Sequence, residues 1–272
     1  MPELPEIETL RLQLKPKLEG SILSRLFIFH EDILGTSRED LERQLPGKKI
    51  LSLSRRGKYL ALNLEGAMSL WFHLGMTGQL VWDSDTRGHD PRAHLAIEFE
   101  EVAEKLIFRD VRKFGVAFLT NAHPQSFPEG LRLLGPEPFD VDENAFARFF
   151  KSRRARIKSL LLNQRVIAGL GNIYADESLH RAGIDPRRRS CRIPRGKLGD
   201  LYRAVRETLS EAIRHGGSSI DDYLHPDGRR GSFQHFHRVY GRFRERCLSC
   251  RSIIRRIRIA GRSSFFCPQC QK

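Results

Sequence analysis

The sequence begins Met1-Pro2-Glu3-Leu4-Pro5-Glu6, and the rest of the fold is interpreted outward from this stretch. Proline and acidic residues at these positions suit the first turn of a helix. The apolar residues that follow recur at helical spacing and stop at a glycine. They are Leu4, Ile7, Leu10, Leu14 and Leu18, with Gly20 as the stop. We therefore predict that the chain opens with a helix.

The chemistry of this end depends on Pro2. A small residue after Met1 favours removal of the initiator methionine, which leaves a terminal secondary amine. An α-amino group titrates near pH ~8, so a useful fraction is neutral at pH 7. Its attack on a sugar aldehyde carbon gives an iminium ion, with Glu3 beside it as a proton donor. The helix dipole disfavours the protonated amine. The alternative is an ordinary helix start, with Glu3 as a helix-initiating acid.

Charge is distributed unevenly along the chain. The 272 residues carry a formal net charge of +14, which indicates an anionic partner. Residues 1–150 have 19 Lys+Arg against 23 Asp+Glu, whereas residues 151–272 have 28 against 10, a net charge of +18. A membrane is the competing anion, but we find no long apolar run and no signal peptide. We expect a soluble, cytoplasmic protein whose second half holds a polyanion.

Short strands are predicted from the first helix to about Leu119. The segments are apolar or alternating and are broken by Gly, Pro, Asn or Asp. Their spacing indicates an antiparallel β-sandwich or barrel. The expected strands are Lys48–Ser54, Lys58–Leu64, Ser69–Leu74, His94–Phe99, Leu106–Arg109 and Val116–Thr120.

A linker at Gly135–Phe139 separates this region from helical periodicity. Helices are expected at Asp142–Ser152, Ile157–Asn163, Ile173–Ala182 and Arg195–His215. The following segment, Gly216–Arg242, is rich in Gly, Ser, Asp and His, and is interpreted as a long functional loop. The fold class is therefore α+β. We expect three parts: residues 1–134, residues 135–237 and residues 238–272.

Four of the five cysteines form the motif Cys247-x2-Cys250-x16-Cys267-x2-Cys270. Two Cys-x-x-Cys pairs (knuckles) at this separation form a closed tetrahedral Zn²⁺ site. Because four thiolates leave no open position, one structural zinc ion is expected. A redox dithiol is the less favoured alternative, and the odd cysteine count argues against a disulfide framework. The histidines at 225, 235 and 237 are interpreted as loop or surface groups.

The segment between the knuckles is predicted to be a basic β-hairpin that needs the metal to fold. Its arginines are Arg255, Arg256, Arg258 and Arg262. A second candidate polyanion site is Gly169-Leu170-Gly171-Asn172, just before a helix. A tight helix connection would explain it equally well. The surrounding basic charge favours a phosphate site, in which backbone N–H groups and Asn172 donate to phosphate.

Four motifs together make the chain resemble the formamidopyrimidine-DNA glycosylase family over essentially its whole length. They are Pro2–Glu6, His73–Gly78, Gly169–Tyr174 and the four-cysteine ribbon, in the family's order. Leu4 and the His73–Gly78 segment resemble the bacterial branch that removes 8-oxoguanine more than the endonuclease VIII relatives. The resemblance implies an N-terminal helix with an antiparallel β-sandwich, then a helix-two-turn-helix domain and a β-hairpin zinc ribbon.

The resemblance also implies a function. The family flips a damaged base out of duplex DNA and is both glycosylase and abasic-site lyase. Pro2 would attack the sugar C1′ and form a Schiff base, Glu3 would move protons, and β,δ-elimination would cut the strand. The partner would be damaged double-stranded DNA, bound by a monomer without any membrane contact.

Individual site residues follow from the same resemblance. Lys58 and Arg262 match a lysine that approaches the lesion and a hairpin arginine that grips phosphate. Three residues would fill the space left by the flipped base: Met76, Arg112 and Phe114. The remaining DNA-binding residues would be His94, Arg154, Lys158 and Asn172. Ser218–Ser232 would cover the extruded base. Without the resemblance, Lys58 is a surface lysine and the two apolar residues belong to the core.

The sequence departs from the family pattern at Arg251, where many relatives have a glycine that eases the knuckle turn, and in the basic run Gly228–Gly231. The chemistry is therefore better specified than the preferred lesion. Two alternatives stay open: an oxidised-pyrimidine glycosylase of the endonuclease VIII type, and a non-catalytic zinc-ribbon protein that binds damaged DNA.

Overall fold

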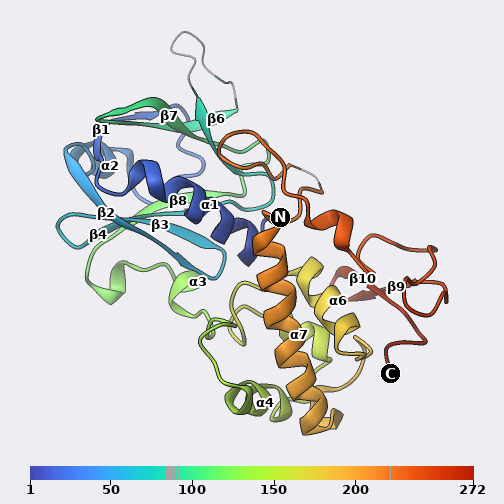
Figure 1. The fold of residues 1–272 in the computed structure, drawn as a ribbon. Helices are drawn as coiled ribbons and strands as arrows, with labels where there is room; N and C mark the ends of the chain where they lie inside the picture. The colour runs from blue at the N-terminus through green and yellow to red at the C-terminus, as the bar shows by residue number, and fades with distance from the viewer. Residues whose placement is uncertain (84–89, 91, 221) are drawn as a thin grey trace. The chain divides into compact units, whose positions relative to one another are not determined.

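The computed structural model describes residues 1–83, 90, 92–220 and 222–272, which form two compact units (Figure 1). The first unit consists of residues 1–132 and 215–232. The second consists of residues 133–214 and 233–272. The loop 215–232, although it follows the helical region in sequence, thus folds with the N-terminal helix.

The first unit opens with helix α1 (Leu4–Leu18), as the helical spacing of its apolar residues predicts. Its five apolar residues at helical spacing, Leu4, Ile7, Leu10, Leu14 and Leu18, are fully buried, and the helix packs on strands β2 and β3. A short helix, α2 (Arg38–Gln44), begins at Ser37, whose hydroxyl accepts a hydrogen bond from the Asp40 N–H at 3.2 Å. The unit ends with a 3-10 turn, η1 (Pro124–Ser126), and helix α3 (Glu129–Arg132).

Eight strands form one antiparallel sheet in the order β5-β7-β6-β1-β2-β3-β4-β8. Their bounds are β1 Ile22–Ile28, β2 Lys48–Arg56, β3 Tyr59–Leu64, β4 Met68–His73, β5 Gln79–Asp83, β6 Ala93–Phe99, β7 Val102–Arg109 and β8 Val116–Thr120. Only two residue pairs, Ile22 with Lys49 and Leu23 with Lys48, join β1 to β2, so the sheet consists of two four-stranded halves.

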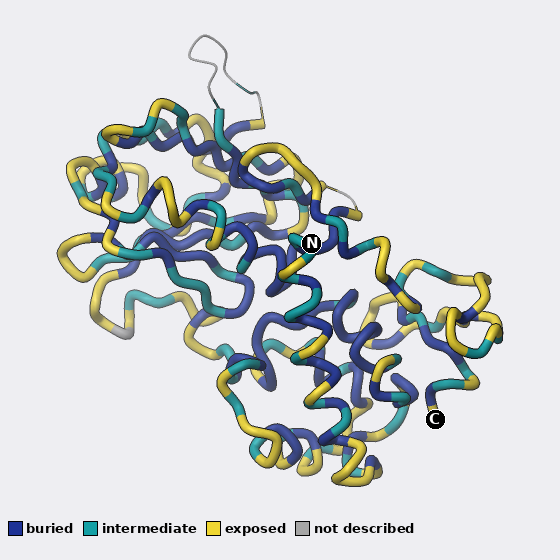
Figure 2. The backbone as a smooth tube through the Cα atoms, viewed as in Figure 1, coloured by how far each residue is buried: buried dark blue, intermediate teal, exposed yellow. Residues whose placement is uncertain are grey.

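One apolar core lies between the two halves and α1, as expected of a sandwich (Figure 2). Leu95 and Phe108 come from one half, Leu62 and Phe72 from the other, and Leu10 from the helix, all essentially inaccessible. The ring of Phe72 meets that of Phe108 edge to face, with 5.5 Å between the centroids. The N-terminal helix is therefore fixed to the sheet through shared apolar burial.

The second unit is mainly helical, with α4 (Glu143–Lys151), α5 (Ile157–Leu161), α6 (Asn172–Arg181) and α7 (Arg195–Arg214). Two 3-10 turns, η2 (Ser190–Arg192) and η3 (Phe233–Phe236), precede and follow α7. The long helix α7 contacts both α4 and α6. Asp142 caps α4 by accepting a hydrogen bond from the Ala145 N–H at 2.7 Å.

The C-terminal hairpin pairs β9 (Arg255–Ile259) with β10 (Arg262–Phe266). Its apolar support is small, consisting of Val239, Ile254 and two of the cysteines, with Phe265 packed against them. The α+β fold class is confirmed, and so are the six expected strands and five expected helices within a few residues. The sequence did not predict α2, β1 or β5. No helix in the described ranges is long and apolar enough to cross a membrane.

Candidate active site and nucleic-acid interface

The N-terminal end of α1 places Pro2 and Glu3 in a buried position. Glu3 is the N-cap residue of the helix and is 2% exposed, whereas Met1 before it is 37% exposed. The Glu3 N–H donates to the Glu6 carboxylate at 2.7 Å, which holds the start of the helix. Pro2 and Glu3 are thus both buried at the start of α1, and the Glu6 carboxylate fixes the backbone there.

Glu6 also joins this end to the loop 215–232 of the same unit. Its other carboxylate oxygen accepts the Ser218 N–H at 2.8 Å, and its backbone carbonyl accepts the Tyr223 hydroxyl at 3.1 Å. Gly217 has a φ of +77°, and a Cβ there would lie 2.7 Å from a Glu6 oxygen. Only glycine therefore permits this approach. The loop expected to cover an extruded base is therefore hydrogen-bonded to the first turn of the helix that follows Pro2.

Lys58 lies in the turn between β2 and β3 and is buried rather than on the surface, at 6% exposure. Its positive charge affects the pKa of His73, the last residue of β4. Burial, and to a lesser degree the positive charge of Lys58, lowers the pKa of His73 to about 4. The imidazole is therefore neutral at physiological pH.

Asp110 organises the loop that follows β7. This carboxylate is 1% exposed and accepts backbone N–H groups of Phe114 at 2.8 Å and Gly115 at 2.7 Å. Its second oxygen accepts the Arg112 N–H at 3.2 Å and the Thr77 hydroxyl. One side chain therefore fixes the loop 110–115 and ties it to the turn 74–78. A Cβ at Gly75 would lie 2.4 Å from the Phe114 carbonyl carbon, so the two backbones are in contact.

The three residues predicted to fill a base-sized space are brought together by this loop and turn. Met76 and Phe114 are 41% and 57% exposed, which is unusual for large apolar side chains, and Arg112 is exposed too. The Arg112 guanidinium lies 4.8 Å from the centre of the Phe114 ring. These side chains do not belong to the core. They form an exposed apolar and cationic tip on a rigid base.

His94, predicted to contact phosphate, is buried beneath this loop at 2% exposure. Its Nε2–H donates to the Asp110 carbonyl at 2.9 Å, and its Nδ1 has no hydrogen-bond partner among the residues that the structure describes. In this arrangement His94 supports the Asp110 loop from below.

In the second unit, the predicted residues converge on β10. Lys158 is fully buried, forms an ion pair of 2.7 Å with Asp176, and donates to the Ser263 carbonyl at 3.2 Å. The Asn172 side-chain amide donates to the same carbonyl at 2.9 Å. Burial raises the pKa of Asp176 to about 7, although Lys158 opposes that shift. Arg262, next to Ser263, stays exposed. Lys158 thus holds the hairpin that presents Arg262.

Glu177, the next residue on α6, holds the segment that leads into the ribbon. Its carboxylate accepts backbone N–H groups of Arg238 at 2.8 Å, Val239 at 2.9 Å and Tyr240 at 2.8 Å. Burial raises the pKa of Glu177. Helix α6 therefore fixes the ribbon at two places through two adjacent carboxylates.

The four cysteines are arranged as a metal site. The sulfur atoms of Cys247, Cys250, Cys267 and Cys270 all lie within 4.8 Å of one another. Four soft thiolate ligands at this separation suit one tetrahedral zinc ion. His180 lies beside the site, with its Nε2 3.8 Å from the Cys247 sulfur. Arg251 follows Cys250 with a φ of +66°, a conformation in which glycine would be unstrained.

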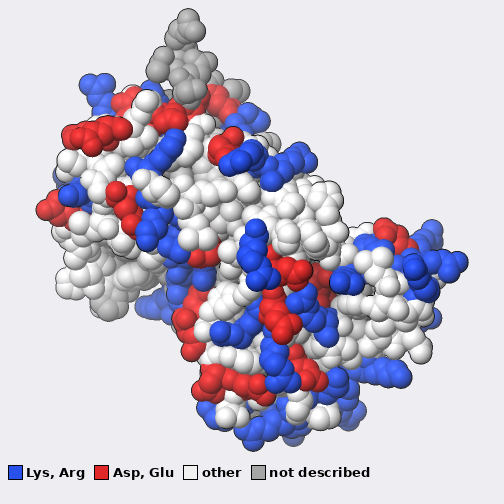
Figure 3. All heavy atoms as spheres, viewed as in Figure 1, with Lys and Arg blue, Asp and Glu red and all other residues white. Residues whose placement is uncertain are grey.

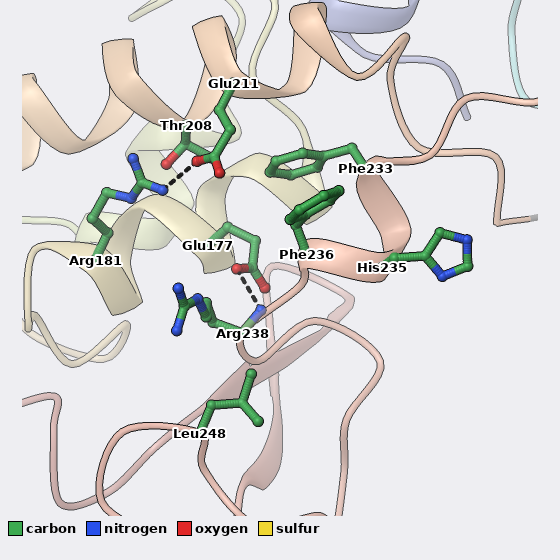
Figure 4. A pocket seen from close by; sticks show the side chains of 9 residues that line it. All are labelled: Glu177, Arg181, Thr208, Glu211, Phe233, His235, Phe236, Arg238 and Leu248. Carbon is green, nitrogen blue, oxygen red and sulfur yellow. Dashed lines mark hydrogen bonds and ion pairs between the residues drawn. The ribbon is translucent and has the colours of Figure 1, made fainter.

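Lys and Arg side chains are spread over the exposed surface of the second unit (Figure 3). Arg154 is exposed and lies just before α5. A pocket of about 260 Å³ lies elsewhere in this unit, between α6, α7, η3 and Leu248 (Figure 4). Three of its charged residues are already engaged: Arg181 pairs with Glu211, and Glu177 binds backbone N–H groups. None of the predicted site residues lines it.

Several structurally important residues were not predicted from the sequence. They are Glu6, Asp110, Asp176, Glu177 and His180. Asp110 had a usable signal, because an aspartate at the head of a glycine-ended loop often accepts the following N–H groups. The partners of Glu177 lie 61 to 63 residues away, so no local pattern reveals them.

Comparison with protein families finds three matches that together span most of the chain. Residues 1–117 match the formamidopyrimidine-DNA glycosylase N-terminal domain, residues 134–223 the H2TH domain of the same proteins, and residues 244–272 a zinc finger found in FPG and IleRS.

Relatives are similar over their full length. The formamidopyrimidine-DNA glycosylase of Solibacter usitatus is 44% identical over 272 residues, covering 100% of both chains. The Fpg crystal structure from Thermus thermophilus is 38% identical, with a TM-score of 0.89, covering 99% of this chain and 98% of that one. A Lactococcus lactis Fpg mutant in complex with Fapy-dG-containing DNA is 36% identical, with a TM-score of 0.92 and 100% coverage of both.

Proposed function

This chain belongs to the formamidopyrimidine-DNA glycosylase family, and on that premise we propose that it excises oxidised purines from DNA through its N-terminal proline. It is a DNA glycosylase of base excision repair, and one zinc ion is held by its four clustered cysteines. The substrates proposed are 8-oxoguanine and formamidopyrimidines in double-stranded DNA. We place the protein in the cytoplasm with the nucleoid, acting as a monomer.

The observation that carries this proposal is the buried start of α1. The Glu6 carboxylate accepts hydrogen bonds both from this start and from the loop 215–232. After Met1 is removed, the Pro2 nitrogen attacks C1′ of the damaged nucleotide while the C1′–base bond breaks, and the departing base takes up the proton that the amine loses. Glu3, the next residue, protonates the sugar ring oxygen; the C1′–oxygen bond then breaks, which opens the ring and leaves an iminium ion. Glu6 contributes by fixing both the nucleophile and the loop that covers the base.

The iminium ion then serves as an electron sink for strand cleavage. Loss of a C2′ proton expels the 3′ phosphate, and a second elimination expels the 5′ phosphate. Hydrolysis of the iminium returns the free proline. Lys58 is the nearby buried cation and suits the phosphate beside the lesion.

Extrusion of the base leaves a gap in the duplex, which the exposed tip formed by Met76, Arg112 and Phe114 would fill. Met76 and Phe114 would replace the lost stacking, and Arg112 would hydrogen-bond the unpaired cytosine. The second unit would bind the phosphates with Arg154, Asn172 and Arg262, and Lys158 supports the hairpin that carries Arg262. In the first unit, His94 supports the Asp110 loop.

Borohydride reduction tests the covalent step. A protein with an N-terminal tag, compared before and after proteolytic release of Pro2, should form a trapped complex with an 8-oxoguanine:cytosine duplex only after release. Mass spectrometry should locate the sugar adduct on residue 2. An adduct on an internal lysine would refute the proposal.

The products distinguish the alternatives. A one-nucleotide gap with phosphates on both sides would support β,δ-elimination. Faster cleavage of a thymine-glycol duplex than of an 8-oxoguanine duplex would indicate the endonuclease VIII type. Binding without any strand scission would indicate a non-catalytic damage-binding protein.

A further inference from the structure

Two basic segments of the second unit lie side by side. Residues 151–156 read Lys-Ser-Arg-Arg-Ala-Arg and residues 187–192 read Arg-Arg-Arg-Ser-Cys-Arg, so eight of twelve residues are cationic and none is acidic. The Ser190 N–H donates to the Ala155 carbonyl at 2.9 Å, and the Cys191 N–H donates to the Arg153 carbonyl at 3.0 Å. We call these two antiparallel segments the arginine ridge.

The ridge is rigid. The Ile157 N–H donates to the Arg188 carbonyl at 2.8 Å, and the Ser190 hydroxyl donates to the Phe150 carbonyl at 2.6 Å. The Lys151 Nζ donates to the Cys191 carbonyl at 2.8 Å. Both segments are thus anchored to buried parts of the unit, and their backbone is ordered before any ligand binds.

Most of its charge is not neutralised by the protein. Arg187 pairs with Asp185, but four exposed arginines form no ion pair with any acid in the described ranges. They are Arg154, Arg156, Arg189 and Arg192. Arg156 and Arg189 even face each other across a β-bridge, a position where like charges destabilise the pair. A cationic surface held in this way favours a polyanionic ligand.

The ridge is continuous with the proposed DNA interface. It contains Arg154 and leads directly into α5, whose Lys158 holds the Ser263 carbonyl beside Arg262. We propose, building on the proposed function, that Arg156, Arg189 and Arg192 bind phosphates of duplex DNA beyond the damaged site and lengthen the footprint. The ligand is the phosphodiester backbone, so this contact does not depend on base sequence.

The salt dependence of binding gives the expected size of the effect. Each phosphate contact contributes about 0.9 to the slope of log K against log salt on duplex DNA. The triple variant Arg156→Gln/Arg189→Gln/Arg192→Gln should therefore lower the slope by about 2 to 3 on a duplex of about four helical turns. On a duplex of about one turn, centred on an abasic site, the slope should be unchanged.

Matched variants control for charge and folding. Lys197→Gln/Arg203→Gln/Arg214→Gln removes three exposed cations from α7 and should leave both slopes as in the wild type. Arg189→Gln alone should lower the long-duplex slope by about 1. It replaces the triple variant if the latter shows a lower melting temperature or zinc content.

Two outcomes would overturn the ridge proposal: equal slopes for wild type and variants on the long duplex, or an equal loss on both lengths. Borohydride trapping on the short abasic duplex, at saturating protein, separates this from the proposed function. Normal trapping by the variant with an unchanged long-duplex slope refutes the ridge alone. Absence of trapping in the wild type refutes the covalent mechanism.

Discussion

Asp110→Asn should impair base extrusion without impairing covalent chemistry. The carboxylate accepts four donors, from Phe114, Gly115, Arg112 and Thr77. An asparagine keeps one oxygen and turns an NH2 group toward one of the two donor pairs. The cheaper orientation places the NH2 toward Thr77, whose hydroxyl can rotate to accept, and the Arg112 N–H loses its carboxylate acceptor.

The substitution should destabilise the ordered loop by about 2 to 3 kcal/mol. A hydrogen bond to a charged group contributes about 1.5–3 kcal/mol, and the remaining hydrogen bonds are made to a neutral acceptor instead of a carboxylate. The loss is local, since the loop 110–115 is exposed at its tip and opens without unfolding the sheet. Because about 1.4 kcal/mol corresponds to a factor of ten, the equilibrium constant between the ordered and the open loop should fall roughly 30- to 150-fold.

Single-turnover excision of 8-oxoguanine opposite cytosine should slow by up to that factor, whereas trapping on a preformed abasic site, which has no base to extrude, should slow much less. Asp142→Asn, which neutralises the α4 cap with an equally good capping residue, should change neither rate. Equal slowing on both substrates, or no slowing of excision, would refute the reasoning.

Three further perturbations test other parts of the structure. Arg251→Gly should stabilise the ribbon by about 1 kcal/mol, because φ at this position is +66°; slower zinc loss to a chelator would show it, and faster loss would contradict it. Zinc removal should unfold the ribbon and abolish DNA binding while the circular dichroism of the β-rich unit persists, since the ribbon has little apolar core of its own. The pKa of His73 is about 4 when folded and 6.5 when unfolded, so the unfolded state takes up the proton first as pH falls. Stability should therefore decrease between about pH 6.5 and pH 4, by about 3 kcal/mol in total, and urea unfolding of His73→Gln should show a flatter pH profile over that window.

Sequence patterns predicted what depends on local periodicity or fixed spacing. The helix α1, the six strands and the cysteine ligands each follow from one short motif. The strand β5 was missed because its five residues show no alternation that distinguishes them from a loop. Residues 215–232 were expected to belong to the middle part, residues 135–237. They fold with α1 in the first unit instead, because Glu6 accepts a hydrogen bond from Ser218, 212 residues away.

The site residues show a different limit. Resemblance assigned DNA contacts to Lys158 and His94, and those assignments stay predictions. In the structure Lys158 is 0% exposed and pairs with Asp176, and His94 is 2% exposed and donates to the Asp110 carbonyl. A pattern of residue types specifies that a cation or an imidazole is needed at a position. It does not specify whether the group touches the ligand or holds the group that does, because burial depends on the whole fold.

Helix α6 illustrates why such supporting groups are charged. Burying a carboxylate is costly unless it is paired or accepts several hydrogen bonds. Asp176 meets that condition with Lys158 and the Phe265 N–H, and Glu177 meets it with three backbone N–H groups. Two adjacent residues on one helix therefore grip β10 and the segment 238–240 separately, with directional bonds that an apolar contact would not supply. A ribbon with almost no core of its own is thereby oriented by the same helix whose first residue, Asn172, is proposed to meet phosphate. Metal binding alone would fold the ribbon, but these bonds, together with those from Lys158 and Asn172 to the Ser263 carbonyl, fix the position of Arg262 relative to that helix.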